Sequence, residues 1–337
     1  MKKIEVLLLC GGGSAEHEVS LVSANYLESV LSTIPSLNVT RVEITSVGWR
    51  SESHAACRLD LDKVLTVGDR KVTLDYVVPC IHGFPGETGE IQSLFELAGL
   101  PYMGCDSAAS NICFNKITSK LWFDAIGIEN TPYIFLSEQS EQAYRDGEAA
   151  FDKWGTLFVK AACQGSSVGC YKVNDKSAVR TAIDNAFEYS EQVLIEQAVK
   201  PRELEVAAYQ YGDEIIVTNP GEICCPSDTF YTYDEKYSSD SHSETTLDPR
   251  NLTEEQTSQM REMARKAFIH LKLKDLSRID FFLTPNGKVL LNEINTFPGM
   301  TPISMFPKLV EHNGHSFADY LASCIDRGLN AKSSLTS

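Results

Sequence analysis

The sequence predicts an α/β protein built of more than one lobe, and three observations support this prediction. The chain has 337 residues, which is enough for two or three packed lobes and too long for one ordinary core. Its composition, with 43% hydrophobic and 23% charged residues, is typical of a globular protein. In the first third, strand-like runs alternate with helix-like periods, which is the pattern of parallel strands joined by crossover helices.

The elements of the first third follow from their apolar patterns. Ligands of open α/β sheets bind beyond the carboxyl ends of the strands. Two glycine-rich segments, 10–13 and 80–90, lie at such ends, where glycine lets a ligand approach the backbone and the following helix offers free N–H groups. The expected elements are strands at 6–10, 39–47 and 75–83, and helices at 17–32 and 91–99, the second closed by Gly99.

The rest of the chain predicts a helix, further strands and two polar segments. The segment 227–246 has too many Ser, Asp and Tyr residues for a core and is long for a plain connection, so we expect a lid. Residues 330–337 are expected to form a loose tail. The helix is expected at 116–127, with strands at 131–136, within 158–173, at 193–199 and at 202–206, where a third portion begins.

Charge and cysteine content exclude several classes of protein. A net charge of −16 argues against a nucleic-acid groove, which needs a basic face, but not against a small anionic substrate held by local cations. The chain has no run of about eighteen uncharged apolar residues, so we expect no membrane span, and its apolar start is too short for a signal peptide. The ten cysteines lack zinc-site spacing and are expected to be reduced, mostly buried thiols of a cytoplasmic protein.

The loop CQGSSVG, residues 163–169, predicts a phosphate site or a tight hairpin. Gly165 and Gly169 permit an unusual backbone, and Ser166 and Ser167 add hydroxyl donors. Successive N–H groups of such a loop cradle phosphate oxygens, and Lys160 supplies a positive charge just before it. The loop lacks the ending of a Walker motif, so on its own residues both interpretations stay open.

The dipeptide Asn286-Gly287 is a strong signal for a two-residue hairpin turn. Counting back from this turn pairs two carboxylates across the strands and pairs a guanidinium with an amide. Because side chains alternate along a strand, the four emerge on one face: Arg278, Asp280, Glu293 and Asn295.

Two carboxylates placed directly opposite repel each other unless a proton or a cation relieves them. An oxygen set of two carboxylates and an amide suits Mg²⁺, which shares its shell with waters and substrate phosphates. The alternative is a surface hairpin with scattered charges, and a slip of one residue in register would break the pairing.

Several segments, taken together and in order, are similar to the D-alanine–D-alanine ligases of the ATP-grasp superfamily. They are GGGSAEHEVSL, HGFPGETGEIQSLFELAGLPYMG, NKITSK, FVKAACQGSSVG, LIEQAVKPRELEV, FYTYDEKYSSD and RIDFFLTPNGKVLLNEINTFPGMT with ISMFPKL. The resemblance implies a three-lobed ATP-grasp architecture of α/β and α+β lobes. Its parts would be an N-terminal parallel α/β domain at 1–115, a central subdomain at 116–198 and a C-terminal subdomain at 199–330.

The resemblance also implies the reaction. ATP would phosphorylate one D-alanine, and a second D-alanine would attack the acyl phosphate to give D-alanyl-D-alanine, ADP and phosphate for peptidoglycan synthesis. The implied cofactors are ATP as co-substrate and two Mg²⁺ (or Mn²⁺), and the protein would be a cytoplasmic homodimer that binds neither nucleic acid nor membrane. The alternatives are a ligase for D-serine or another second substrate, and a catalytically silent regulator that binds nucleotide.

Site residues are implied position by position. For the amino acids they are Glu16 and His82 at the first D-alanine, Arg278 and Gly299 at the oxyanion, and Ser304 and Met305 at the second D-alanine. For ATP they are Lys116, Lys160, Ser166, Ser167, Glu196, Gln197, Val199, Glu203 and Lys236, and for metal they are Asp280, Glu293 and Asn295. Ser167, Tyr237 and Glu16 would form a hydrogen-bonded latch. Lys120, one helical turn after Lys116, is expected to be a solvated lysine.

Overall fold

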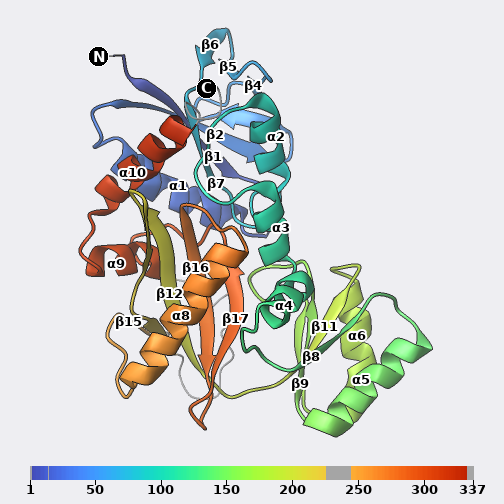
Figure 1. Cartoon of the computed structure of the whole chain (residues 1–337). Helices are drawn as coiled ribbons and strands as arrows, with labels where there is room; N and C mark the ends of the chain where they lie inside the picture. The colour runs from blue at the N-terminus through green and yellow to red at the C-terminus, as the bar shows by residue number, and fades with distance from the viewer. Residues whose placement is uncertain (1, 14, 225–243, 332–337) are drawn as a thin grey trace.

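The computed structural model describes residues 2–13, 15–224 and 244–331, and these form four sheets. Three larger sheets follow one another along the chain, as the change of colour in Figure 1 shows. Each of the three predicted portions therefore carries a sheet of its own, while their boundaries at 115 and 198 remain predictions. Within the described ranges, no helix is long and apolar enough to cross a membrane.

The first sheet has the order β3-β2-β1-β7, and β1 is parallel to both of its neighbours, as predicted. Residues of β1 are buried on both faces, because alternate side chains enter two different hydrophobic clusters, and this explains their unbroken apolar run. Its elements are β1 (Ile4–Gly11), α1 (His17–Leu31), β2 (Leu37–Thr45), β3 (Gly48–Ser51), β7 (Tyr76–Cys80) and α2 (Glu90–Ala98).

Between β3 and β7 lies a small sheet that the sequence analysis missed. Its three short antiparallel strands are β4 (Cys57–Leu59), β5 (Val64–Val67) and β6 (Arg70–Thr73). Leu65 and Val72 are the buried members, and they join the cluster on the α2 side of the first sheet. Strands of three or four residues carry too few alternating positions to be recognised by pattern.

The central sheet is antiparallel, with the order β10-β9-β11-β8. Asn115 caps the helix that precedes it, accepting hydrogen bonds from the N–H groups of Ile117 and Thr118. The elements are α3 (Ser107–Phe114), α4 (Lys116–Ala125), β8 (Tyr133–Leu136), α5 (Glu141–Trp154), β9 (Leu157–Ala161), β10 (Cys170–Val173), the short 3₁₀ turn η1 (Lys176–Ala178), α6 (Val179–Phe187) and β11 (Val193–Gln197).

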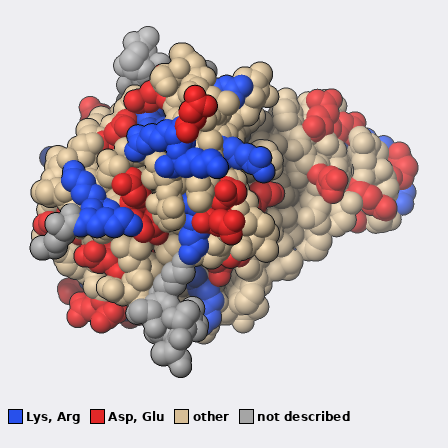
Figure 2. Space-filling model, turned by 90° about the horizontal axis from the view of Figure 1, so that it is seen from above, with Lys and Arg blue, Asp and Glu red and all other residues tan. Residues whose placement is uncertain are grey.

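Among the charged side chains of the part at the right of Figure 2, Asp and Glu predominate over Lys and Arg. Some of them are paired: Arg180 of α6 contacts Glu141 and Glu148 of α5 at 3.3 and 2.7 Å. Such exposed pairs contribute little to stability. They do keep α5 and α6 aligned over the same face of the central sheet.

The third sheet has six strands in the order β15-β14-β12-β16-β17, with β13 paired to β12. A capping box at Thr253 and Gln256 starts α8, the long helix that packs against this sheet. The elements are β12 (Arg202–Tyr211), β13 (Glu214–Val217), β14 (Gly221–Cys224), β15 (Glu244–Thr246), α8 (Glu254–His270), β16 (Leu276–Leu283), β17 (Val289–Asn295), α9 (Met305–His312) and α10 (Phe317–Ala331). The predicted lid at 227–246 lies almost entirely outside the described residues.

The β16–β17 hairpin confirms the predicted pairs, although its turn differs from the prediction. Arg278 pairs with Asn295 and Asp280 with Glu293. The loop has three residues, 285–287, because the Thr284 N–H donates to the Lys288 carbonyl at 3.0 Å. The longer loop shifts the register by one, and a bulge that leaves Asn292 unmatched shifts it back before the carboxylates are reached.

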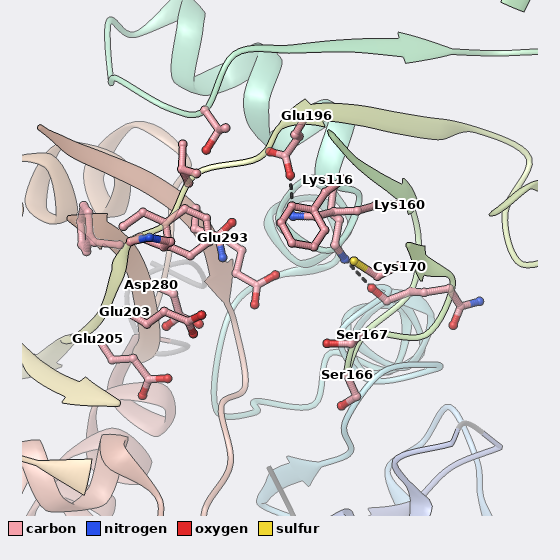
Figure 3. Close-up of a pocket in the computed structure, with 18 of the residues that line it drawn as sticks. Lys116, Lys160, Ser166, Ser167, Cys170, Glu196, Glu203, Glu205, Asp280 and Glu293 are labelled. Atoms are coloured by element: carbon pink, nitrogen blue, oxygen red, sulfur yellow. Dashed lines mark hydrogen bonds and ion pairs between the residues drawn. The ribbon is translucent and has the colours of Figure 1, made fainter. Parts of the chain in front are cut away.

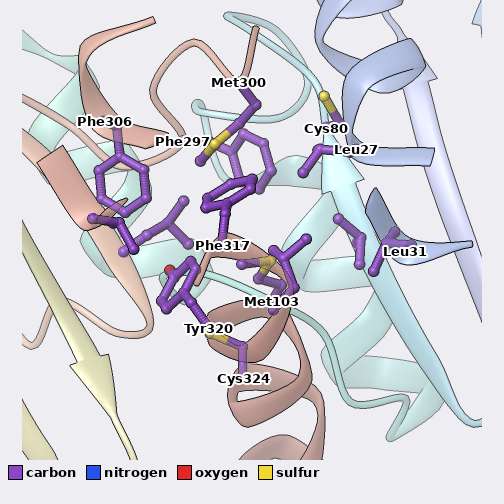
Figure 4. Packing of buried hydrophobic residues seen from close by; sticks show 14 of the residues in the cluster. Leu27, Leu31, Cys80, Met103, Phe297, Met300, Phe306, Phe317, Tyr320 and Cys324 are labelled. Carbon is purple, nitrogen blue, oxygen red and sulfur yellow. The ribbon is translucent and has the colours of Figure 1, made fainter. Parts of the chain in front are cut away.

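The last helix returns to the first sheet (Figure 1). Its buried residues Tyr320 and Cys324 join a cluster with Leu27 and Leu31 of α1, which Figure 4 shows from close by. The hydroxyl of Tyr76 on β7 donates to the Cys324 carbonyl at 3.3 Å. One face of the N-terminal sheet is therefore completed by the end of the chain.

Candidate active site

A cavity lies between the central and third sheets, and it gathers most of the residues predicted to bind ATP and metal (Figure 3). They come from α4, from β9 and the loop that follows it, from β11 and the segment after it, and from the β12, β16 and β17 strands. The predicted residues that line it are Lys116, Lys160, Ser166, Ser167, Glu196, Gln197, Val199, Glu203, Arg278, Asp280 and Glu293.

The segment CQGSSVG forms a longer loop between β9 and β10 than a tight hairpin turn, and its role as a phosphate site stays a prediction. The flanking strands are antiparallel, so the loop is a hairpin connection, and its two serines also line the cavity. Ser166 and Ser167 have φ values of +49° and +63°, a left-handed backbone that non-glycine residues rarely adopt. The ammonium of Lys116 donates to the carbonyl of Gln164 and holds this end of the loop against α4. A strained loop held this way is typical of a ligand site.

At the other end of the cavity, Glu196 lies between two lysines. Its Oε2 is 2.5 Å from the ammonium of Lys160 and its Oε1 is 2.6 Å from that of Lys120. Burial alone would raise the pKa of the Glu196 carboxyl, but the two ammonium groups outweigh it and bring the pKa down to about 2. The prediction that Lys120 is solvated is wrong: its side chain is 2% exposed, because the α4 face that carries Lys116 also faces Glu196.

On the β16–β17 hairpin, Arg278 balances carboxylates of two strands. It contacts Asp280 through two hydrogen bonds of 2.7 Å and lies 3.3 Å from Glu205, a residue that the sequence analysis did not assign. Burial would lower the pKa of the guanidinium, but Asp280 and Glu205 outweigh it and raise the pKa further. Asn295 donates to Asp280 at 3.0 Å, so three of the four predicted neighbours are in contact.

The donor set fits Mg²⁺ bound together with a polyphosphate. The described residues lining the cavity include five acids, Glu196, Glu203, Glu205, Asp280 and Glu293, but only three bases, Lys116, Lys160 and Arg278. An anionic ligand would be repelled by this surplus unless divalent cations came with it. Within the described ranges, no group of three His, Cys, Asp or Glu side chains is arranged to hold a metal ion.

The predicted first D-alanine residues lie where β1 and β7 end. Glu16 precedes α1 and is 9% exposed, and the Ser166 hydroxyl of the β9–β10 loop donates to its Oε1. Gly165 lies directly over this carboxylate, since a Cβ there would be 2.7 Å from Oε2. His82 hydrogen-bonds Ser23 at 3.0 Å, and burial, although opposed by the Glu16 charge, lowers its pKa, so the imidazole is neutral at pH 7.

Glu87 is a further acid of this region that the sequence analysis missed, although it lies in the quoted segment HGFPGETGE. Burial, reinforced by the negative charge of Glu16, raises the pKa of its carboxyl to about 8. Its Oε2 accepts a hydrogen bond of 3.0 Å from the Gly83 N–H. The signal that could have found it is its place in a glycine loop at the carboxyl end of a parallel strand.

The predicted second-substrate residues form a turn before α9. The Ser304 hydroxyl accepts from the Thr301 N–H at 3.0 Å, and a Cβ at Gly299 would lie 3.0 Å from it. Met305 is 3% exposed and packs against Gly221, so the structure places it in the core. Lys236 and Tyr237 lie outside the described residues, and the latch of Glu16, Ser167 and Tyr237 stays a prediction.

Comparison with known proteins identifies the family. Residues 5–105 match the N-terminal part and residues 122–326 the C-terminal part of D-ala D-ala ligases. The D-alanine–D-alanine ligase of Aeromonas hydrophila is 62% identical over 329 residues, covering 98% of this chain and 100% of the relative. The chain belongs to the D-alanine–D-alanine ligase family.

Solved structures of such ligases share the fold. D-alanyl-alanine synthetase A from Vibrio cholerae O1 has a TM-score of 0.94 at 55% identity, covering 98% of this chain and 99% of that one. A D-Ala:D-Ser ligase from Enterococcus faecalis has a TM-score of 0.86 at 29% identity, covering 97% and 100%. The predicted D-alanine–D-alanine ligase family and mixed α/β fold are therefore confirmed, and the serine-specific relative is the more distant of the two.

Proposed function

We propose that this chain joins two D-alanines to D-alanyl-D-alanine, with ATP activating the first as D-alanyl phosphate and with ADP and phosphate released. The observation that carries the proposal is the hydrogen bond from Ser166 to Glu16. It joins the loop expected to hold the transferred phosphate to the carboxylate expected to hold the first amino acid. Phosphorylation of the amino-acid carboxylate requires the ATP phosphates and the amino acid to be held side by side, and this junction would do so.

ATP would lie along the cavity from Glu196 to the hairpin carboxylates. Glu196, Gln197 and Val199 would bind adenine, and Glu203 would bind the ribose, because all four line the cavity from the end of β11 to the start of β12. Lys116, Lys160, Ser166 and Ser167 also line the cavity and would contact the phosphates. The positive groups offset the charge that spreads over a phosphoryl group during transfer.

Asp280, Glu293 and Asn295 would hold two Mg²⁺ (or Mn²⁺). When bound, these ions supply positive charge to the phosphoryl oxygens. Arg278, already oriented by Asp280 and Glu205, would stabilise the oxyanion that develops on the attacked carboxyl group, together with the Gly299 N–H. The guanidinium keeps its charge throughout, since its pKa lies far above neutrality.

The two amino acids would bind to separate groups of residues. Glu16 would bind the ammonium of the first D-alanine, and the neutral His82 beside it would add no competing charge. Ser304 would bind the carboxylate of the second. We propose a cytoplasmic homodimer because of the family resemblance. Light scattering of the purified protein tests the dimer.

The deciding experiment measures phosphate release from ATP and Mg²⁺ with D-alanine alone, and with D-alanine plus D-serine or D-lactate, with products identified by mass. Release with D-alanine alone and a D-alanyl-D-alanine product is the expected result. Turnover only with a mixed pair would overturn the second substrate. Nucleotide binding without turnover by any pair would make the protein a silent regulator.

A further inference from the structure

The structure contains a buried lysine that none of these roles uses. Lys120 is 2% exposed, and besides Glu196 its ammonium reaches the side-chain oxygen of Asn130 at 3.1 Å and the carbonyl of Thr131 at 3.2 Å. Removing an ammonium ion from water is unfavourable by several kcal/mol unless its partners replace the water well. Three oxygens at hydrogen-bonding distance do so, and packing alone would be served better by an apolar side chain.

Lys120 lies behind the cavity wall and acts on it through Glu196. Glu196 and Lys160 line the cavity, whereas Lys120 is not among the described lining residues. Glu196 is therefore held from two directions, by one cation on the wall at 2.5 Å and one behind it at 2.6 Å. Two contacts on the two different oxygens fix the plane of the carboxylate as well as its position.

The fixed carboxylate is an acceptor and nothing else. With its pKa near 2, Glu196 stays ionised across the physiological range and has no proton to donate. Its Oε1 lies 2.6 Å from the Lys120 ammonium and, as a carboxylate oxygen, can accept a second hydrogen bond, while the buried hydroxyl of Thr131 has no hydrogen-bond partner among the described residues. Both residues line the cavity, so a ligand with a polar edge is expected at this end.

We propose that Lys120 is a positioning residue that selects the nucleobase, by holding Glu196 oriented to accept a hydrogen bond from the 6-amino group of a purine. A 6-oxo purine would present an acceptor to this acceptor, and a desolvated pair of that kind is strongly unfavourable. The inference rests on the proposed binding of ATP in this cavity. According to this proposal, base preference originates in Lys120, a residue that does not itself contact the nucleotide.

The test compares nucleotides that differ at purine position 6. Binding of ADP and of inosine diphosphate is measured by calorimetry on the full-length protein and on Lys120→Met, and turnover is measured with ATP and inosine triphosphate. We expect ADP affinity to fall about tenfold or more while inosine diphosphate affinity changes little, because a hydrogen bond to a charged group is lost only with the amino base. The kcat with ATP should stay within about threefold, with the loss appearing in KM.

Lys274→Met is the matched control, since Lys274 is a half-buried lysine that contacts Tyr102 away from the cavity. It should leave the base preference unchanged. If Lys120→Met does not fold, the double variant Lys120→Met with Glu196→Gln removes one charge of each sign, and its amide both donates and accepts, so preference should vanish. An equal loss with both bases, or an unchanged preference in a folded variant, overturns the inference.

The binding measurement needs no amino acid, so it determines base preference even if the protein does not ligate D-alanine. An ADP preference that is lost in Lys120→Met supports the inference even if the ligation assay fails. Absence of ADP binding by the unaltered protein would overturn the inference and the proposed function together.

Discussion

The two ends of the cavity treat buried charge in opposite ways. At one end, a single carboxylate, Glu196, faces two ammonium groups at 2.5 and 2.6 Å. At the other, Arg278 contacts two carboxylates, Asp280 and Glu205, and a third, Glu293, pairs with Asp280 across the hairpin. At the first end the protein's own cations outnumber the carboxylate by one, while the second end leaves negative charge that bound cations must offset.

The largest effect should come from weakening the acidic end. Glu293→Gln removes one of the two carboxylates that face each other, and we expect kcat/KM to fall roughly a hundredfold or more, with a higher Mg²⁺ requirement. Thermal stability should not fall, because a like-charge repulsion is relieved. Phosphate release measured against Mg²⁺ concentration, with thermal unfolding in parallel, checks both statements.

The control for that variant is an acid that contacts the turn of the same hairpin from the segment between α4 and β8. Glu129→Gln removes the same charge from an acid that is half exposed and 3.5 Å from Lys288, outside the cavity. Its Mg²⁺ dependence should match that of the unaltered protein. Equal losses in the two variants would mean that total charge, and not the paired carboxylates, governs metal use.

A smaller effect should follow from crowding the junction between the two substrates. Gly165→Ala places a methyl group 2.7 Å from Glu16 Oε2, so the carboxylate or the loop must move. We expect the KM for D-alanine to rise about tenfold, with a smaller change in the KM for ATP. Gly13→Ala is the matched control, because a Cβ at Gly13 meets no atom within 4 Å. If only the KM for ATP changed, Glu16 would not be a binding residue for the first D-alanine.

The last prediction concerns how stability, and not activity, depends on pH, through the buried acid Glu87 outside the cavity. The folded-state pKa of Glu87 is about 8, above its ordinary value of 4.5, so its stabilising contribution is complete below pH 4.5 and is lost as pH rises toward 8. Glu87→Gln should flatten the decline of the unfolding free energy between pH 5 and 8, by at most about 1.4 kcal/mol per pH unit. Urea denaturation at several pH values measures it. The exposed neighbour variant Glu90→Gln should keep the original slope, and identical slopes in all three proteins would contradict the prediction.

The sequence predicted the hairpin pairs for a reason that was only partly right. The expected two-residue turn is a three-residue loop, and the extra residue Asn292 in β17 cancels the resulting shift. Neither irregularity alone can be read from Asn286-Gly287, because that dipeptide fits both loops. What the sequence did constrain is the result, since only this register puts the charged residues on the face away from the core.

Lys120 shows where a pattern stops being informative. Its spacing of four residues from Lys116 places both lysines on one face of α4, and that signal was available. The sequence cannot say that Glu196, seventy-six residues later, meets this face, because the meeting depends on how β11 joins the central sheet. The packing of α10 was missed for the same reason, since it depends on contacts distant in sequence, whereas the strands β4 to β6 were missed because they are short.

The return of α10 to the first sheet sets the order in which the chain can be completed. Tyr76 of β7 packs against Gly328, where a Cβ would lie 2.4 Å from its ring, so no larger residue fits at position 328 and this contact forms only once residue 328 is present. During synthesis from the N-terminus, β1, α1 and β7 emerge while their apolar face still waits for the last helix. During translation the N-terminal lobe therefore exposes the apolar surface that α10 later covers. A chain that stops before α10 would keep this surface exposed to solvent.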